Sequence, residues 1–194
     1  MTLRKRLIAL SMAAACAATA FAGAAFTDQS SIKVDSKVID TLTEKNVIKG
    51  FENGSFQPDK AVTRAQMAKM MFVLRTGSDD ASYYATDMTD TFTDTAGTWS
   101  NGYVKYCQAY GIVSGKSSTV FAPNASVTTA EAAKMLRVYS GHDVQKDGLT
   151  GAQWKENTLK LADAEGLLTC VTTKPDDALP RQYAAQMIYN AISK

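Results

Sequence analysis

Histidine and cysteine, the side chains that most often bind metals or act as nucleophiles, are scarce in this chain. Among 194 residues there are three cysteines and one histidine, His142. A Cys–His or Ser–His–Asp mechanism would have to use His142, which we interpret as a solvated linker residue. No HExxH motif, histidine pair or CxxC motif occurs, so we predict neither a metal nor a cofactor. A glycosidase needs only two carboxylates, but no such pair stands out, and we predict no enzyme.

A strong excess of charge of one sign is also missing. The chain has 21 Lys and Arg residues against 19 Asp and Glu residues. Removal of an N-terminal segment that holds three of the basic residues would leave 18 against 19. No basic surface is implied, so we expect no nucleic-acid partner.

Long apolar runs are limited to one, at the N-terminus. Basic residues at positions 4–6 precede an apolar stretch from Leu7 to Ala20, and Ala22-Gly23-Ala24 follows as a cleavage site. This pattern predicts a secretory signal peptide over 1–25 and a secreted protein. A lipoprotein that uses Cys16 is the alternative. The run is too short and too rich in alanine for a membrane span, and we predict none elsewhere.

Cys107 and Cys170 lie beyond the predicted signal peptide. Export permits a disulfide, but two cysteines do not make a disulfide framework, and spacing does not show that they meet. Burial of both as small hydrophobic side chains is at least as good an interpretation.

The chain repeats itself. Residues 46–74 align with residues 111–139 at a constant offset of 65, and ten of the 29 positions are identical. A weaker third copy keeps the spacing from Trp99 to Gly111 as Trp154 to Gly166. We predict repeats over 26–75, 92–141 and 149–193, with the third degenerate and a polar linker over 76–91. The identical positions include Gly50/Gly115, Phe56/Phe121, Pro58/Pro123, Thr63/Thr128, Lys69/Lys134 and Met70/Met135.

Each repeat has the pattern of helix, loop and helix. The spacing of apolar residues predicts a first helix that ends at Gly111 in the second copy. Thr63 with Gln66, and Thr128 with Glu131, fit capping boxes at the start of the second helix. A methionine-rich stripe follows, which we interpret as core packing. One such hairpin cannot bury its apolar face, so we predict an all-α fold in which three repeats share a core.

The ordered motifs Phe92-Thr93-Asp94, Trp99, Gly111 to Gly115, Phe121-Ala122-Pro123 and Thr63 to Gln66 resemble the S-layer homology (SLH) domain family. The resemblance implies a pseudo-three-fold, three-lobed spindle of helices. It also implies non-covalent anchoring to the bacterial cell wall or S-layer, through a secondary wall polysaccharide that carries pyruvylated sugars and binds in grooves between the lobes. Other surface-layer proteins are further expected partners.

The resemblance places glycan-binding residues at Arg64, Trp99, Trp154, Arg181, Asp28, Asp94, Gly50 and Gly115. Arg64 opens a capped helix, where helix N–H groups and a guanidinium suit a carboxylate. Its alternative is an ion pair with an acidic neighbour such as Asp59. The tryptophans are sugar-stacking faces or core anchors. For both aspartates we expect mainly a helix cap.

The motif residues are unevenly distributed. The second repeat has Thr129 where arginine belongs, and the first has Val34 at the tryptophan position. If a groove draws on two neighbouring lobes, Arg64 could serve with Trp99. We therefore expect one or two composite sites and not three equal ones. The alternatives are an SLH-like protein-interaction module that has lost glycan binding, and a small wall hydrolase.

Overall fold

The computed structural model describes residues 26–87, 89 and 91–193. The predicted signal peptide and the alternative through Cys16 lie outside these residues. The described part contains η1 (Gln29–Ser31), α1 (Ser36–Glu44), α2 (Arg64–Thr76), α3 (Ser82–Asp87), α4 (Asn101–Ala109), α5 (Thr129–Tyr139), α6 (Trp154–Ala164) and α7 (Arg181–Ile192). Extended pairing within this part is limited to isolated bridges. The predicted all-α fold is confirmed.

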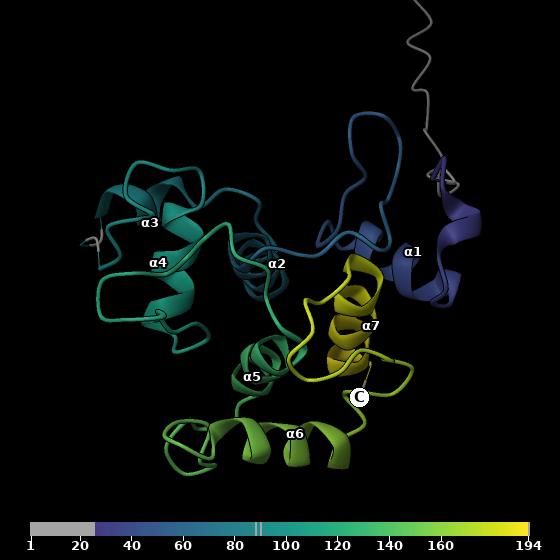
Figure 1. Ribbon diagram of the computed structural model, residues 1–194. Helices are drawn as coiled ribbons and strands as arrows, with labels where there is room; N and C mark the ends of the chain where they lie inside the picture. Colours follow the sequence, from purple (N-terminus) through teal and green to yellow (C-terminus); the bar gives the residue numbers. More distant parts are fainter. Residues whose placement is uncertain (1–25, 88, 90, 194) are drawn as a thin grey trace, which may run out of the picture.

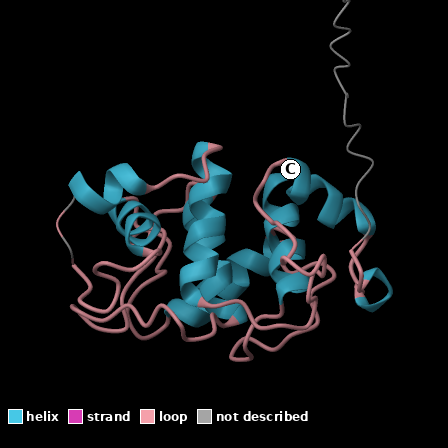
Figure 2. Cartoon of the chain, turned by 90° about the horizontal axis from the view of Figure 1, so that it is seen from above, coloured by secondary structure: helices cyan, strands magenta, loops and turns pink. Residues whose placement is uncertain are grey.

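The helices form three helix–loop–helix units, α1–α2, α4–α5 and α6–α7, which make three lobes (Figure 1). The second helix of each unit packs against the first helix of the next: α2 against α4, α5 against α6, and α7 against α1. The contact of α7 with α1 closes the arrangement into a ring. The long connecting loops gather along one side of the molecule (Figure 2). Because every lobe contains helices from two units, each interface between units is also part of the core.

A cycle of backbone hydrogen bonds joins the three units at the centre. It uses the residue that precedes the N-cap of each second helix. The amide of Val62 donates to the carbonyl of Leu179, the amide of Leu179 to Val127, and the amide of Val127 to Val62, each over 2.9 Å. All three side chains are buried. Each bond links two different units, so none of them can form inside an isolated repeat.

The second helices begin as predicted in two units. The Thr63 hydroxyl accepts from the Gln66 amide at 3.2 Å, and the Gln66 side chain accepts from the Thr63 amide at 3.0 Å. Thr128 and Glu131 make the same reciprocal pair at the start of α5. In the third unit Pro180 occupies the cap position, and no side-chain cap bond forms.

The first two amides of each second helix donate to the loop of another unit. Their acceptors are the carbonyls of Ala125 and Pro123 for α2, of Asp177 and Pro175 for α5, and of Lys60 and Pro58 for α7. The N–H groups that a helix start leaves without intrahelical partners are therefore satisfied by protein. The start of each helix and the loop of its neighbour must form together.

The methionine stripe of α2 lies in the core, as predicted. Met67 and Met71 are fully buried and Met70 is 5% exposed. The turn that ends the first helices also follows the expected chemistry, since Gly111 has a φ of 68° and Gly166 a φ of 67°. Left-handed backbone of this kind favours glycine and closes a helix C-terminus.

Equivalent positions in α2 and α5 carry opposite chemistry. Phe72 packs edge-on against the rings of Tyr103 and Tyr106, with centroids 5.2 and 4.9 Å away. The residue 65 positions later, Arg137, is fully buried and forms an ion pair with Glu165. The α2–α4 contact is therefore aromatic, whereas the α5–α6 contact has an ion pair at its centre.

His142 belongs to this charged contact. Its Nε2 lies 2.7 Å from a carboxylate oxygen of Glu165, and its Nδ1 lies 3.0 Å from Asp147. The interpretation of His142 as a solvated linker residue is wrong, because the two carboxylates hold the ring against the end of α5. Both ring nitrogens have structural partners.

The segment over 76–91, which the composition marks as a polar linker, is packed against the core. It contains α3, whose Tyr84 ring lies 5.8 Å from that of Phe72. Asp80 accepts from the amide of Ser82 at 2.8 Å at the start of this helix. The polar residues thus form local caps while the aromatic residue enters the core.

Candidate functional site

Asp94 holds a loop and does not cap a helix. Its two carboxylate oxygens accept from the amides of Phe121 and Ala122 at 2.9 and 2.7 Å. Ala122 has a φ of 61°, which turns consecutive N–H groups toward one anion. In the first unit, the amides of Phe56 and Gln57 donate in the same way to Asp28, both over 2.8 Å.

The expectation that Asp28 and Asp94 mainly cap helices is therefore wrong. Neither makes a side-chain cap bond, because the loop amides take both oxygens of each carboxylate. The hydrogen bonds from the loop, led by that from Phe56, hold the pKa of Asp28 below its usual 3.8. Each aspartate fixes a loop whose phenylalanine ring lies under an arginine of another unit.

Arg64 is almost fully buried beneath the loop that Asp94 holds. Its Nε donates to the carbonyl of Phe121 at 2.9 Å, and its Nη2 donates to the carbonyl of Ser114 at 2.7 Å. Its Nη1 lies 3.4 Å from Glu131, and its guanidinium stacks 4.5 Å from the centre of the Phe121 ring. Burial lowers the pKa of Arg64, and the charge of Glu131 partly offsets that effect. The guanidinium is held by protein on several sides.

The helix start at Arg64 differs from the expected carboxylate site. The amides of Arg64 and Ala65 donate to carbonyls of the neighbouring loop, so they do not face a ligand. The acidic partner of Arg64 is Glu131 and not Asp59, which accepts instead from Gln182. Glu131 belongs to another unit, which is why local sequence could not identify it.

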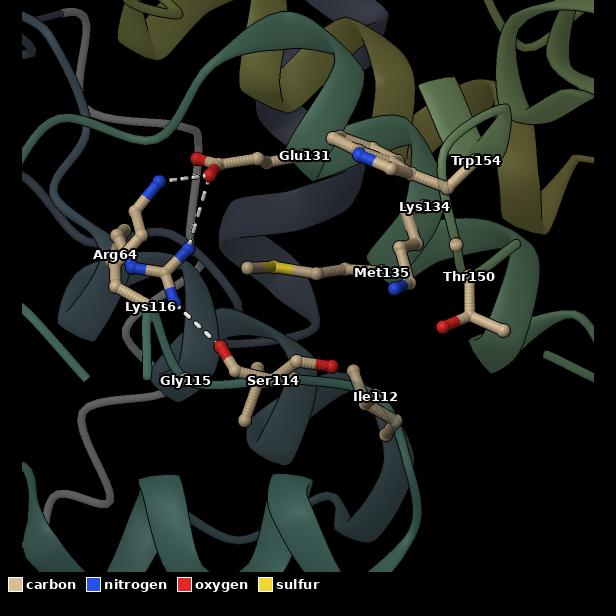
Figure 3. A pocket seen from close by; sticks show the side chains of 12 residues that line it. Arg64, Ile112, Ser114, Gly115, Lys116, Glu131, Lys134, Met135, Thr150 and Trp154 are labelled. Atoms are coloured by element: carbon tan, nitrogen blue, oxygen red, sulfur yellow. Dashed lines mark hydrogen bonds and ion pairs between the residues drawn. The ribbon is translucent and has the colours of Figure 1, made fainter. Parts of the chain in front are cut away.

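A cavity of about 280 Å³ opens next to Arg64 (Figure 3). We call it the first groove. All three units contribute to its walls, which include Arg64, Ser114, Lys116, Glu131, Lys134 and Trp154. Lys116 and Arg64 converge on Glu131 at one side of the groove, while Lys134 and Trp154 lie at the other side (Figure 3). Three cations and one carboxylate make the groove electropositive.

Lys134 is the cation of the first groove that no carboxylate neutralises. Among the described residues, no acidic side chain lies within ion-pair distance of its ammonium group, which sits 5.5 Å from the centre of the Trp154 ring. Burial lowers the pKa of Lys134 more than the charge of Glu131 raises it. Sequence reasoning missed this residue, although the identity of Lys69 and Lys134 between the repeats was a signal for it.

The structure pairs the arginines and tryptophans differently from the expected combination. Arg64 shares the first groove with Trp154, not with Trp99. Trp99 is 58% exposed, does not line the cavity beside Lys69 and packs on Tyr103, with ring centres 6.1 Å apart. The ring beneath the ammonium group of Lys69 is that of Tyr103, at 5.1 Å, whereas Trp154 itself lies beneath Lys134.

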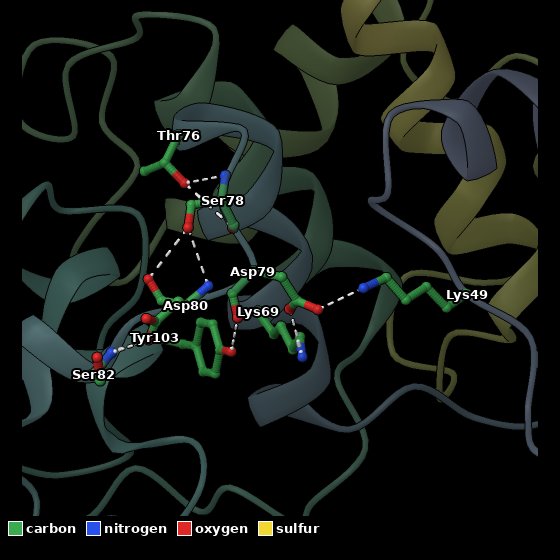
Figure 4. Close-up of polar contacts among 8 residues, drawn as sticks. All are labelled: Lys49, Lys69, Thr76, Ser78, Asp79, Asp80, Ser82 and Tyr103. Atoms are coloured by element: carbon green, nitrogen blue, oxygen red, sulfur yellow. Dashed lines mark hydrogen bonds and ion pairs between the residues drawn. The ribbon is translucent and has the colours of Figure 1, made fainter. Parts of the chain in front are cut away.

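A smaller cavity of about 160 Å³ is the pseudo-symmetric counterpart, which we call the second groove. Its lining includes Lys49, Lys69, Asp79 and Arg181. Asp79 lies 2.6 Å from the ammonium group of Lys49 and 2.7 Å from that of Lys69 (Figure 4). Burial tends to lower the pKa of Lys69, but the hydrogen bond and charge of Asp79 outweigh it and raise that pKa. The single carboxylate therefore forms an ion pair with each of the two lysines.

Arg181 occupies the place of Arg64 in the second groove. It is 8% exposed, donates to the carbonyl of Lys49 and lies 5.2 and 5.0 Å from the ring centres of Phe51 and Phe56. No acidic residue of the described chain pairs with it, and its buried Nε has no hydrogen-bond partner. Burial lowers the pKa of Arg181 to about 10, so it stays protonated at neutral pH.

At the third equivalent position Thr129 replaces the arginine. Its hydroxyl bonds that of Thr173 over 2.9 Å, so this position carries no cation. Of the predicted glycines, Gly115 lines the first groove, and a Cβ there would lie 2.4 Å from the Phe92 ring. A Cβ on Gly50 would lie 2.7 Å from the ring of Phe26. Both glycines allow an aromatic ring to approach the backbone closely.

The two cysteines do not pair. Cys107 is buried, and its Sγ donates to the carbonyl of Ala68 at 3.3 Å, whereas Cys170 is exposed. Burial raises the pKa of the Cys107 thiol to about 12. Interpretation as a small buried side chain is confirmed for Cys107 and wrong for Cys170. Among the described residues, no cluster of potential metal ligands occurs, and no helix is long and apolar enough to cross a membrane.

Comparison with known proteins identifies the repeated motif. Residues 25–68 and 91–133 match the family model of the S-layer homology domain. The chain is 27% identical over 190 residues to the middle cell wall protein of Brevibacillus brevis, an alignment that covers 96% of this chain and 17% of that protein.

Two further relatives extend the comparison. The cellulosome-anchoring protein of Acetivibrio thermocellus is 29% identical over 113 residues, which cover 57% of this chain and 24% of that protein. The S-layer protein sap of Bacillus anthracis is 28% identical over 157 residues, which cover 78% and 19%. The chain thus spans less than a quarter of the length of these relatives.

Proposed function

The chain is an S-layer homology domain protein, and we propose that it is fastened to a bacterial cell wall by binding an anionic wall polysaccharide. The relatives carry names that refer to the cell wall, the S-layer and cellulosome anchoring. Two of these names refer to the cell wall or the S-layer, and the third refers to anchoring, which supports attachment at the cell surface as the role of this chain.

The observation that carries the proposal is the free cation of the first groove. Lys134 is half-buried and has no carboxylate within ion-pair distance among the described residues. A buried charge without a partner is costly, and an anionic ligand supplies the partner at a low local dielectric. Arg64 and Lys116 add positive charge on the opposite side of the same cavity.

The chemistry of the groove fits a sugar that carries a carboxylate, as a pyruvyl ketal does. Lys134 pairs with the carboxylate as a compact charge donor. The indole of Trp154 offers an apolar face to the sugar ring and an N–H group to its hydroxyls. In this proposal Arg64 is a support for the wall of the groove, because its donors already bond Phe121, Ser114 and Glu131.

Sedimentation with purified cell walls tests the proposal. We expect the protein to sediment with intact walls and to stay in solution once the secondary polysaccharide has been stripped. Retention by stripped walls would contradict glycan binding and support attachment to a wall protein instead.

Lys134→Met tests the carrying observation at residue level. The change removes the charge and keeps a long apolar side chain, so the fold should survive. We expect the affinity for a pyruvylated wall fragment to fall at least about tenfold, since a charge-assisted hydrogen bond contributes roughly 1.5–3 kcal/mol. Lys37→Met is the matched control, because Lys37 is exposed on α1, far from the lining of the groove. Equal affinities of the two variants would overturn the role of Lys134.

A further inference from the structure

A second, larger cavity of about 370 Å³ continues the first groove beyond Lys134. The two cavities share five residues as walls: Val113, Ser114, Gly115, Lys134 and Thr150. The far walls of the second cavity come from the end of α4, the loop after Gly115 and the segment that joins α5 to α6. A ligand chain that leaves the first groove past Lys134 therefore enters another bounded space, not bulk solvent.

Four of the polar side chains that line this cavity are uncharged and have no protein partner, whereas Lys134 also lines it and the Ser117 hydroxyl accepts from the amides of Thr119 and Val120. Gln108, Ser118, Gln145 and Thr150 all line it. Within the described residues, none of these four side chains makes a hydrogen bond or an ion pair. Their amide and hydroxyl groups are donors and acceptors of the kind that sugar hydroxyls and acetamides bond.

The cavity also has apolar walls and a fixed edge. Phe92 and Val113 contribute buried apolar surface. The carboxylate of Asp143 accepts from the amides of Gln145 and Lys146, each over 2.9 Å, and so orders the segment that carries Gln145. Away from Lys134 the walls are apolar or polar and uncharged, which suits a neutral sugar ring better than a second anion.

We propose that this cavity is a subsite for a neutral sugar, adjacent to the anionic sugar in the first groove. The inference rests on the proposed function and adds a ligand class to it. The ligand is an oligosaccharide in which a carboxylate-bearing sugar is linked to a neutral hexose or N-acetylhexosamine. Lys134 lies at the boundary and binds the anionic residue, while Gln108, Ser118 and Gln145 bond its neutral neighbour.

Calorimetry on the purified full chain tests the subsite with three probes. These are a pyruvylated monosaccharide and two disaccharides that extend it by one neutral N-acetylhexosamine, at the reducing or the non-reducing side. We expect one of the disaccharides to bind about tenfold more tightly than the monosaccharide, as one or two additional hydrogen bonds would give. Equal affinities of all three probes overturn the subsite but leave the proposed function intact. Failure of every probe to bind overturns the proposed function itself.

A double variant locates the additional affinity. Ser118→Ala with Gln145→Ala should abolish the advantage of the disaccharide and leave the affinity for the monosaccharide unchanged, because neither residue lines the first groove. Gln29→Ala with Ser30→Ala is the matched control, since both residues are exposed in the first unit, outside both cavities. An advantage that persists in the Ser118/Gln145 variant would overturn the assignment to this cavity.

Discussion

The first and second grooves have their arginine and one lysine, Lys134 or Lys69, at equivalent positions but leave different cations without a carboxylate partner. Each contains one arginine, two lysines and one carboxylate. In the first groove the carboxylate is that of Glu131, at the start of α5, and it forms ion pairs with Arg64 and Lys116. In the second groove the carboxylate is that of Asp79, after the end of α2, and it forms ion pairs with both lysines.

This difference shows that the place of one carboxylate decides what a groove can bind. In the first groove the cation without a carboxylate partner is Lys134, whose ammonium group lies at the cavity wall beside an indole. In the second groove it is Arg181, which is buried on two phenylalanine rings and donates to a backbone carbonyl. Equal formal charge therefore gives an available cation in one groove and a structural one in the other.

The largest expected effect comes from the arginines. Arg64→Ala should lower the free energy of unfolding by about 3 kcal/mol, because it breaks a buried ion pair and leaves two carbonyls without donors. Arg181→Ala should cost only about 1 kcal/mol, because removal of an unpaired buried charge offsets part of the lost contacts. Urea denaturation of both variants measures the difference. Equal losses would remove the distinction between the two arginines.

A gain of binding should follow when the second groove loses its carboxylate. Asp79→Asn frees Lys49 and Lys69 and should create a second binding event in calorimetric titration with a pyruvylated wall fragment. The cost in stability should be small, about 0.5 kcal/mol, because these ion pairs are partly exposed. Asp80→Asn is the control, since Asp80 bonds the amide of Ser82 and no lysine. An unchanged stoichiometry in Asp79→Asn would show that the carboxylate is not what separates the grooves.

The smallest effect concerns pH. Lys134 attracts a carboxylate ligand only while its ammonium group is protonated. Burial lowers the pKa of this group below its usual 10.5. Binding should be complete at neutral pH and weaken as pH rises through that lowered pKa, by at most about tenfold per pH unit. Titrations at increasing pH, with circular dichroism to confirm folding, measure this. Lys134→Arg should bind with little change over the same range, because arginine stays protonated. A flat profile in the unmodified protein would exclude a role for Lys134.

The fold was largely predictable because the signals that encode it are local. The capping boxes of Thr63 and Thr128, the glycine at 111 and the methionine stripe each depend on residues within one turn or one helix. The offset of 65 between copies then implied a shared core. The helix α3 was missed because its few apolar residues lie among polar ones that form its caps.

The site was less predictable because its partners come from different units. Which tryptophan lies beside Arg64 depends on how α2, α5 and α6 pack against one another. That packing cannot be read from the order of the repeats in the sequence. The same holds for Glu131, which completes a local capping box and also reaches Arg64. When one residue both caps its own helix and pairs with a residue of another unit, the sequence pattern reveals only the capping role.

The central hydrogen-bond cycle has a consequence for how such a protein can change over time. Each unit donates to one neighbour and accepts from the other, and the cycle closes from Leu179 through Val127 to Val62 and back to Leu179. Loss of one unit would leave an unmatched donor and an unmatched acceptor, and an additional unit would have no gap to enter. The ring formed by the described residues therefore closes with three units. The contrast between the grooves of Lys134 and Lys69 shows that substitution within the units can change a groove while the ring stays closed.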